Sequence, residues 1–323
     1  MQTRKLGNTD LHLTTIGLGT WAIGGGEWAY GWGPQDDADS IAAIQRALDL
    51  GINWIDTAAA YGLGHAEEII ARAIKGRRDK VIVATKCGLV WDEGSTNVYS
   101  RLKVASVGKE AEASLRRLNV EFIDLYQIHW PNPKNDIEEA WGVIADLIEE
   151  GKVRHGGVSN FNVAQIKRAQ AIHPVASLQP PYSMLERGVE KELLHYCAQQ
   201  NIGVICYSPM QAGILTDQFT RTRVAKIADE DWRKSDKHFL EPALSANLKL
   251  VEGLRTIAKR HGRTTAQLAI AWVLRRPEVT AAIVGARRPA QIEETVAAAD
   301  WRLSVEDIEE IESLLTEGKR MLK

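Results

Sequence analysis

The chain has 323 residues, enough for one large domain or two ordinary ones. With 45% hydrophobic and 25% charged residues, it has the composition of a globular protein with a sizeable core, which excludes a disordered, collagenous or fibrous chain. Forty basic and 42 acidic residues leave a formal net charge of −2 at pH 7, a balance that gives no field for attracting nucleic acid or an anionic membrane surface. We therefore expect no nucleic acid and no membrane among its partners.

The cysteines and the N-terminal segment indicate the compartment. Cys87, Cys197 and Cys206 are scattered and form neither a CxxC pair nor a disulfide framework, which is typical of a reducing compartment. Residues 1–15 contain no apolar core of signal-peptide length, and nowhere do 18 uncharged apolar residues follow one another. These features predict a cytoplasmic protein without an export signal or a membrane span.

The predicted elements alternate along the chain. A GNTD turn first joins segments 4–6 and 11–13 into a β-hairpin. After it, short and continuously apolar runs alternate with longer amphipathic stretches. The runs predict strands over 16–18, 53–56, 81–86, 123–129, 157–159, 176–179, 203–207 and 282–284, and the stretches predict helices over 37–50, 66–74, 104–118, 137–149, 163–171 and 189–200.

This alternation predicts an α/β fold, a (β/α)₈ TIM barrel. Parallel strands joined by helical crossovers are buried on both faces, so their sequences are continuously apolar. Eight such units favour a closed barrel over an open doubly wound sheet. An additional C-terminal helix is expected over 304–315, where SVED forms a capping box with Asp307 in place of Glu. No repeat or linker divides the chain, so a single domain over 1–323 is expected.

Two segments bear on the kind of binding site. No GxGxxG follows the first strand, because the glycines at 24–26 have the wrong spacing, so the Rossmann dinucleotide signature is absent. Residues 209–244 show no clear periodicity, and a stretch of this length in a compact domain is usually functional. We interpret it as a lid or binding loop.

Titratable side chains follow three successive strands. Asp56 ends the second strand and Tyr61 lies in the loop after it, while Lys86 ends the third strand and His129 the fourth. Taken singly, such a carboxylate is often a cap and such a histidine often a satisfied core residue. Together they point to a catalytic site, because the ends of barrel strands meet at the C-terminal face, where active sites lie.

These four residues suit the reduction of a carbonyl group. A free phenol has a pKa of about 10. A nearby ammonium such as Lys86 is expected to lower the pKa of Tyr61 and make it a better proton donor. Asp56 would keep the lysine charged, and His129 would orient the carbonyl oxygen by a hydrogen bond. The set would protonate an oxygen as charge develops on it, which reduction of an aldehyde or ketone requires.

Seven motifs occur along the chain in the order in which one protein family has them. They are IGLGTW at 16–21, DTAAAYG at 56–62, ATK at 84–86, YQIHWP at 126–131, GVSNF at 157–161, YSPMQAGILT at 207–216 and IVGARRPAQIEE at 283–294. Across nearly its whole length the chain resembles the aldo-keto reductases, in particular the bacterial branch related to general-stress reductases and potassium-channel β-subunits.

The resemblance implies an activity and a cofactor. It implies an NADP-dependent oxidoreductase that reduces aldehydes or ketones to alcohols, with hydride from the nicotinamide and a proton from Tyr61. It also implies a catalytic tetrad of Asp56, Tyr61, Lys86 and His129, and NADPH bound without a Rossmann motif, with NADH possible but less favoured. No metal is implied.

The resemblance assigns cofactor contacts residue by residue. Ser159, Asn160 and Gln179 would hold the nicotinamide carboxamide, and Tyr207 would stack on its ring. Arg287 would meet a 2′-phosphate by a charge-assisted contact. The full set of positions is Gly19, Thr20, Trp21, Asp56, Ser159, Asn160, Gln179, Tyr207, Ser208, Pro209, Met210, Gly213, Leu215, Ile283, Gly285, Ala286, Arg287, Gln291 and Glu294.

The chain departs from the family pattern at two places. Asp217-Gln218 stands where relatives often have Gly-Lys, which removes a positive charge near the expected diphosphate. Thr295 replaces a common asparagine that touches the adenine. Neither departure affects the tetrad.

Tryptophans are expected to line the substrate pocket. Trp21, Trp28, Trp91 and Trp130 lie in or after loops of the active face. Such walls suit apolar or ring-bearing carbonyl compounds and also sugars. No cluster of Arg or Lys in these loops requires an anionic substrate.

Two other functions fit part of this pattern. Channel β-subunits carry the same tetrad, so a cofactor-sensing binding module with little turnover is one alternative. It predicts a stable tetramer. A metal-dependent barrel hydrolase is the other, but only His129 lies at a strand end and the HxH pair is absent. For the oligomeric state, the sequence is compatible with both a monomer and a homo-oligomer.

Overall fold

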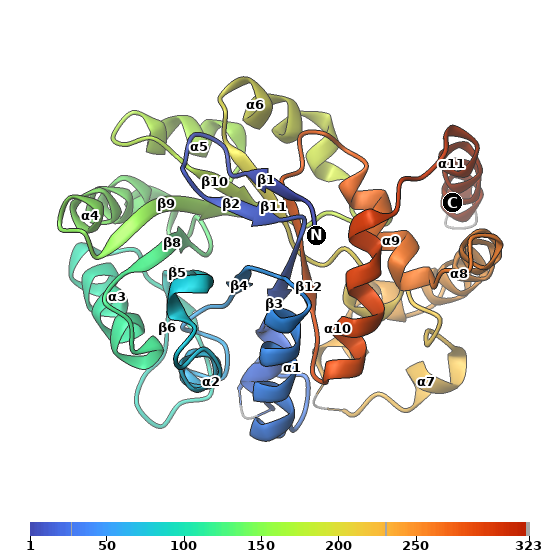
Figure 1. Cartoon of the computed structure of the whole chain (residues 1–323), viewed down its shortest axis with the longest axis horizontal. Helices are drawn as coiled ribbons and strands as arrows, with labels where there is room; N and C mark the ends of the chain where they lie inside the picture. The colour runs from blue at the N-terminus through green and yellow to red at the C-terminus, as the bar shows by residue number, and fades with distance from the viewer. Residues whose placement is uncertain (27, 230, 321–323) are drawn as a thin grey trace.

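Eight parallel strands form a closed barrel with helices around it (Figure 1). The computed structural model describes residues 1–26, 28–229 and 231–320. The strands, in their order around the barrel, are β3 (Ile16–Gly19), β4 (Trp54–Asp56), β5 (Ile82–Cys87), β8 (Ile123–Ile128), β9 (Val153–Ser159), β10 (Ser177–Gln179), β11 (Gly203–Cys206) and β12 (Ala281–Gly285). The predicted TIM barrel is confirmed, and each predicted strand lies on one of these eight.

The register of the closing pair fixes where the strands end. β12 pairs with β3 from Ala282 opposite Ile16 to Gly285 opposite Gly19. β4 pairs with β5 so that Asp56 lies opposite Ala84, two residues before Lys86. Because every barrel pair is parallel, the carboxyl ends of all eight strands meet at one face.

Helices cover the outside of the barrel. Helix α1 shows why: its buried residues Ser40, Ala43, Ile44 and Ala47 follow helical spacing, and the Asp36 carboxylate accepts from the Asp39 amide to cap its start. The helices are α1 (Asp37–Asp49), α2 (His65–Ala73), α3 (Val104–Leu118), α4 (Ile137–Glu149), α5 (Val163–Gln170), α6 (Leu193–Gln199), α7 (Arg221–Ala225), α8 (Ala243–Arg260), α9 (Thr265–Leu274), α10 (Pro289–Val296) and α11 (Val305–Arg320). Within the described ranges, no helix is both long and apolar enough to cross a membrane.

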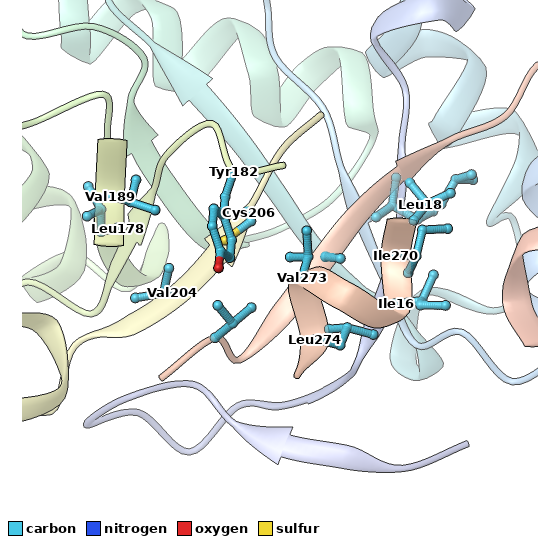
Figure 2. Packing of buried hydrophobic residues seen from close by; sticks show 14 of the residues in the cluster. Ile16, Leu18, Leu178, Tyr182, Val189, Val204, Cys206, Ile270, Val273 and Leu274 are labelled. Atoms are coloured by element: carbon cyan, nitrogen blue, oxygen red, sulfur yellow. The ribbon is translucent and has the colours of Figure 1, made fainter. Parts of the chain in front are cut away.

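Helix α9 is an exception to the amphipathic pattern, because all ten of its residues are buried. Figure 2 shows Ile270, Val273 and Leu274 of this helix among side chains of β3 and β11, including Ile16 and Cys206. A helix enclosed on every side has no polar stripe, so its sequence carries no helical period.

The N-terminal hairpin closes the end of the barrel opposite to the strand ends that carry the tetrad. Its strands are β1 (Thr3–Lys5) and β2 (His12–Thr14), which pair antiparallel. Leu6, Leu11 and Leu13 are buried in one cluster with Trp54 of β4 and other barrel residues. At Gly7, φ is +50°, and a Cβ would lie within 2.8 Å of backbone atoms of three neighbouring residues, so the turn fits against the barrel only as glycine.

A second hairpin, with two residues in each strand, lies beside the mouth of the barrel. It consists of β6 (Leu89–Val90) and β7 (Tyr99–Ser100). The loop between these strands carries Trp91. Strands this short have no pattern of apolar residues, and this hairpin was not predicted.

The free energy of unfolding should depend on pH because Glu110, a partly buried residue of α3, titrates at a raised pKa. Its carboxylate accepts from the Gly88 amide at 2.7 Å and from the Ser106 hydroxyl at 3.0 Å, but burial raises its pKa to about 7. The folded protein therefore holds a proton that the unfolded chain releases between about pH 4.5 and 7. Stability is present below that window and is lost as pH rises through it, by up to about 3 kcal/mol.

Glu110→Gln removes the titration and can keep both contacts, because its amide oxygen accepts from the Gly88 amide and its amide nitrogen donates to the Ser106 hydroxyl oxygen. We expect the variant to match the wild-type free energy of unfolding near pH 4.5 and to exceed it at pH 8, in urea titrations at both values. Equal stability of the two proteins at pH 8 would contradict this assignment.

Candidate active site

The four predicted catalytic residues lie together at the carboxyl ends of the strands. Lys86 Nζ donates to Asp56 Oδ2 at 2.7 Å, to the Thr57 carbonyl at 2.8 Å and to Tyr61 Oη at 3.3 Å. The His129 ring meets the Tyr61 ring edge to face, with centroids 5.8 Å apart. Asp56 and Lys86 are almost fully buried, so their ion pair lies in a low-dielectric site where charges interact strongly.

A glycine turn positions Tyr61 over the lysine. The Tyr61 amide donates to the Ala58 carbonyl, and its own carbonyl accepts from the Ala66 amide at the start of α2. At Gly62, φ is +60° and a Cβ would lie 2.1 Å from the Gly24 carbonyl oxygen. The close approach of the two backbones therefore requires glycine at position 62.

The electrostatics of Tyr61 correct one expectation. The sequence predicts that Lys86 lowers the tyrosine pKa, whereas burial, and then the Asp56 carboxylate, raise it well above its usual value. Both causes disfavour the phenolate. Tyr61 is therefore protonated at neutral pH, and its hydroxyl can donate a hydrogen bond.

The histidine and the lysine are also shifted by burial. Burial and the Lys86 ammonium hold the pKa of His129 well below its usual value, so its imidazole is neutral at neutral pH. Burial also lowers the pKa of Lys86, while its hydrogen-bonded partner Asp56 opposes the loss of the proton. A neutral imidazole still donates one hydrogen bond.

Three residues assigned to the nicotinamide carboxamide form one network. Tyr207 Oη donates to Asn160 Oδ1 at 2.8 Å, and Ser159 Oγ donates to the Gln179 carbonyl at 2.8 Å. Gln179 Nε2 donates to Asp56 Oδ1 at 2.7 Å. The network therefore connects this part of the site directly to the catalytic carboxylate.

A cavity of about 1260 Å³ extends from the tetrad along the barrel mouth. Tyr61, Asp56 and His129 line it, with Lys86 directly behind them. Predicted cofactor and substrate positions that line it are Gly19, Thr20, Trp21, Trp28, Trp130, Ser159, Asn160, Gln179, Tyr207, Ser208, Pro209, Met210, Gly213, Ile283, Gly285, Ala286, Arg287, Gln291 and Glu294.

Besides Lys86, one predicted cofactor residue and one predicted substrate residue are not in this lining. Leu215 is fully buried, and its amide donates to the Met210 carbonyl, so its side chain belongs to the core. Trp91 lies next to β6 with the Arg117 guanidinium 5.9 Å from its ring centroid. Tyr99 of β7 takes a place in the cavity wall instead.

The segment 209–244 contributes residues that the sequence reasoning missed. It contains α7 and three 3₁₀ turns, η5 (Gln211–Gly213), η6 (Trp232–Ser235) and η7 (Lys237–Phe239). Trp232 stacks on Trp21 at 5.4 Å between centroids and meets Trp32 edge to face at 5.8 Å. Its residues in the cavity lining beyond those predicted are Ala212, Thr216, Asp217, Gln218, Phe219, Arg223, Val224, Ile227, Arg233 and Phe239.

Asp217, the departure from the family pattern, anchors this segment. Its carboxylate accepts from the Thr265 amide at 3.0 Å and the Thr265 hydroxyl at 2.6 Å, at the start of α9. Arg255 Nε lies 3.4 Å away. The helix N-terminus and the guanidinium offset the negative charge that Asp217 brings to this part of the cavity.

Arg287 and Arg288 lie at the far end of the cavity. The Arg287 guanidinium donates to the Trp32 carbonyl at 3.2 Å, and also to the Pro34 carbonyl and to Gln35 Oε1. Arg288 is more exposed, with Nε 3.5 Å from Asp39 Oδ2. Arg287 thus ties one loop to another, while Arg288 extends toward solvent beside the cavity.

Comparisons with known proteins identify the family. The model of the aldo/keto reductase family matches residues 15–316. The chain is 39% identical to the aldo-keto reductase YhdN of Bacillus subtilis over 98% of this chain and 94% of the relative. It is 36% identical to the NADH-specific methylglyoxal reductase of Escherichia coli over 95% and 96%.

Solved structures agree as well. The glycerol dehydrogenase AKR11B4 from Gluconobacter oxydans superposes with a TM-score of 0.90 at 37% identity, covering 98% of this chain and 96% of that one. The holo form of the aldo-keto reductase AKR11C1 from Bacillus halodurans gives 0.82 at 27% identity, over 97% and 96%. The chain belongs to the aldo/keto reductase family, whose enzymes use a nicotinamide cofactor and act on small carbonyl compounds.

Proposed function

We propose that this protein reduces aldehydes or ketones to alcohols with NADPH. The main support for this proposal is the contact of Lys86 Nζ with both Asp56 and the protonated Tyr61 at the base of the cavity. A buried phenol beside an ammonium is suited to give up a proton to an oxygen that becomes negatively charged.

The cavity wall fits a nicotinamide cofactor. A Cβ at Gly285 would meet only the Gly19 carbonyl at 3.9 Å, and one at Gly213 would meet nothing within 4 Å, so both glycines leave room beside the cavity. Ser159, Asn160 and Gln179 offer amide and hydroxyl groups for a carboxamide, and Tyr207 offers a ring face. Ser208 and Gly213 would flank the diphosphate.

In this mechanism the residues bind and orient the carbonyl compound. A nicotinamide cofactor held by these residues would supply the hydride. His129 donates a hydrogen bond to the carbonyl oxygen, and Tyr61 Oη gives that oxygen its proton as the new C–H bond forms. The Lys86 ammonium then stabilises the phenolate, and Asp56 stabilises the ammonium.

The substrate half of the cavity favours neutral compounds. Trp21, Trp28 and Trp130 line it, together with Tyr30 and Tyr99. The arginines of the described lining, Arg223, Arg233, Arg287 and Arg288, lie on the segment 209–244 or after β12. Arg233 lies 4.4 Å from the Trp32 ring centroid, but its guanidinium is paired with Asp231, so it offers an anionic substrate group little net charge.

Cofactor oxidation tests this proposal. Absorbance at the nicotinamide band is followed after adding an aromatic aldehyde, a cyclic ketone, a sugar or methylglyoxal, with NADPH and NADH in parallel. Oxidation of NADPH by at least one of these compounds supports the reductase. Tight cofactor binding without oxidation by any of them would instead favour a cofactor-sensing module.

The preference for NADPH is proposed to depend on Arg288. Arg287 is occupied by loop oxygens, so Arg288 is the better placed of the two to meet a 2′-phosphate by charge-assisted hydrogen bonds. Because such bonds are worth about 1.5–3 kcal/mol, Arg288→Ala should raise the Kd for NADPH by at least about tenfold and change that for NADH less than about twofold. Fluorescence titration measures both constants.

Arg287→Ala is the comparison. This variant loosens the loop around Trp32, so it should raise the Kd for NADPH and the Kd for NADH alike. If Arg288→Ala also raised the two Kd values equally, the assignment of Arg288 to the 2′-phosphate would be contradicted.

A further inference from the structure

Outside the barrel, a buried carboxylate bridges the elements that carry Tyr61 and Lys86. Glu67 of α2 and Thr85 of β5 are both fully buried. Thr85 Oγ1 donates to Glu67 Oε1 at 2.6 Å, and Arg117 Nε from α3 donates to Glu67 Oε2 at 2.7 Å. Thr85 precedes Lys86 in the strand, so their side chains point to opposite faces, one to α2 and the other into the barrel.

The same contacts reach the turn that holds Tyr61. The Glu67 amide donates to the Gly64 carbonyl. Gly64 has φ +104°, and a Cβ there would lie 2.7 Å from Arg117 Cδ, so the arginine stem packs against the turn. Tyr61 precedes this turn and Lys86 follows Thr85, so Glu67 connects both catalytic neighbours from behind.

We propose that Glu67 is a positioning residue for the reduction: by binding Thr85 and Arg117 it holds Lys86 against Tyr61 and adds negative charge behind the lysine. The inference rests on the proposed reductase activity. The charge has a consistent effect, because Glu67, after Asp56, opposes the fall in the Lys86 pKa that burial causes.

Glu67→Gln removes the charge and keeps the shape. Because loss of a nearby negative charge lowers the pKa of both a lysine and a tyrosine, the alkaline limb of the rate profile should move to lower pH by about 0.5–1 unit. Misplacement of the pair should also slow hydride transfer by about ten- to a hundredfold. The KM of the carbonyl compound and the Kd for NADPH should change less than about twofold.

Single-turnover rates separate this effect from slow product release, which often limits kcat. Stopped-flow oxidation of enzyme-bound NADPH is measured from pH 6 to 10, and NADPH affinity is measured separately by fluorescence. Glu190→Gln is the matched control. Glu190 also bridges a hydroxyl and an arginine, accepting from Tyr182 at 2.6 Å and Arg187 at 2.9 Å, but it lies on η4 (Gly188–Lys191), away from the tetrad. It should lower the Tm and leave the rate profile unchanged.

Thr85→Val provides a second test if Glu67→Gln does not fold. Valine keeps the shape and suits a strand, but it removes the hydroxyl that Glu67 binds. The single-turnover rate should fall about tenfold with an unchanged KM, and Thr85→Ser should restore it. Folded variants at Glu67 and Thr85 with wild-type rates and alkaline limbs would overturn the inference alone, whereas a wild-type protein without turnover would overturn it together with the proposed function.

Discussion

Replacing Tyr61 with phenylalanine is expected to reduce turnover of every carbonyl substrate by about 10²–10⁴-fold. The change removes the proton donor and keeps the ring, so the cavity wall and its contacts with Trp21 and Trp28 are retained. The Kd for NADPH, measured by fluorescence titration, should therefore stay within about twofold of the wild-type value.

The matched control is Tyr126→Phe. Tyr126 is a fully buried tyrosine of β8 that is not among the residues lining the cavity, and the Cys87 thiol lies beside its hydroxyl. This variant should turn over substrate at the wild-type rate. Wild-type turnover in Tyr61→Phe would show that another group delivers the proton.

Asp56→Asn is expected to reduce both stability and activity. Its carboxylate, almost fully buried, accepts from Lys86 at 2.7 Å and from Gln179 at 2.7 Å. Removing one partner of a buried pair leaves the other charge uncompensated, which costs about 3–5 kcal/mol. The lysine pKa should fall further, because Asp56 is the main group that supports it.

A double variant separates the two effects. Asp56→Asn combined with Lys86→Met removes both charges. The free energy of unfolding of this double variant, measured in urea at pH 7, should therefore regain most of what Asp56→Asn loses, while activity stays absent. The exposed pair of Arg46 and Glu293 gives the reference, because Glu293→Gln should cost less than about 1 kcal/mol. A stable but inactive Asp56→Asn would mean that the pair acts in catalysis without holding the site together.

The barrel and the tetrad could be predicted from sequence because each depends on local patterns. Continuous apolar runs mark strands buried on both faces, and polar residues at the ends of such runs meet at one face of a barrel. Helix α9 was not predicted for the converse reason, since a helix buried all round has no amphipathic period.

The cavity wall was harder to predict because it depends on where loops turn. Trp91 was expected in the pocket because it lies in or after the loops of the active face, but the hairpin of β6 and β7 leaves it beside Arg117 and brings Tyr99 to the cavity. Trp232 belongs to a segment with no periodicity, and its stacking on Trp21 joins positions 211 residues apart in the chain. The effect of burial on the Tyr61 pKa likewise could not be estimated from residue types alone.

The N-terminal hairpin has a consequence for the order of folding. Leu6, Leu11 and Leu13 are buried against residues as late in the chain as Ile283, and Arg4 donates to the Leu274 carbonyl. On the ribosome these leucines therefore lack the last of their native neighbours, Ala281 and Ile283, until β12 has been synthesised. Contacts of such long sequence separation form slowly. Closure of the hairpin end of the barrel is thus a late event, and a nascent chain stalled before β12 would leave one side of the apolar hairpin uncovered.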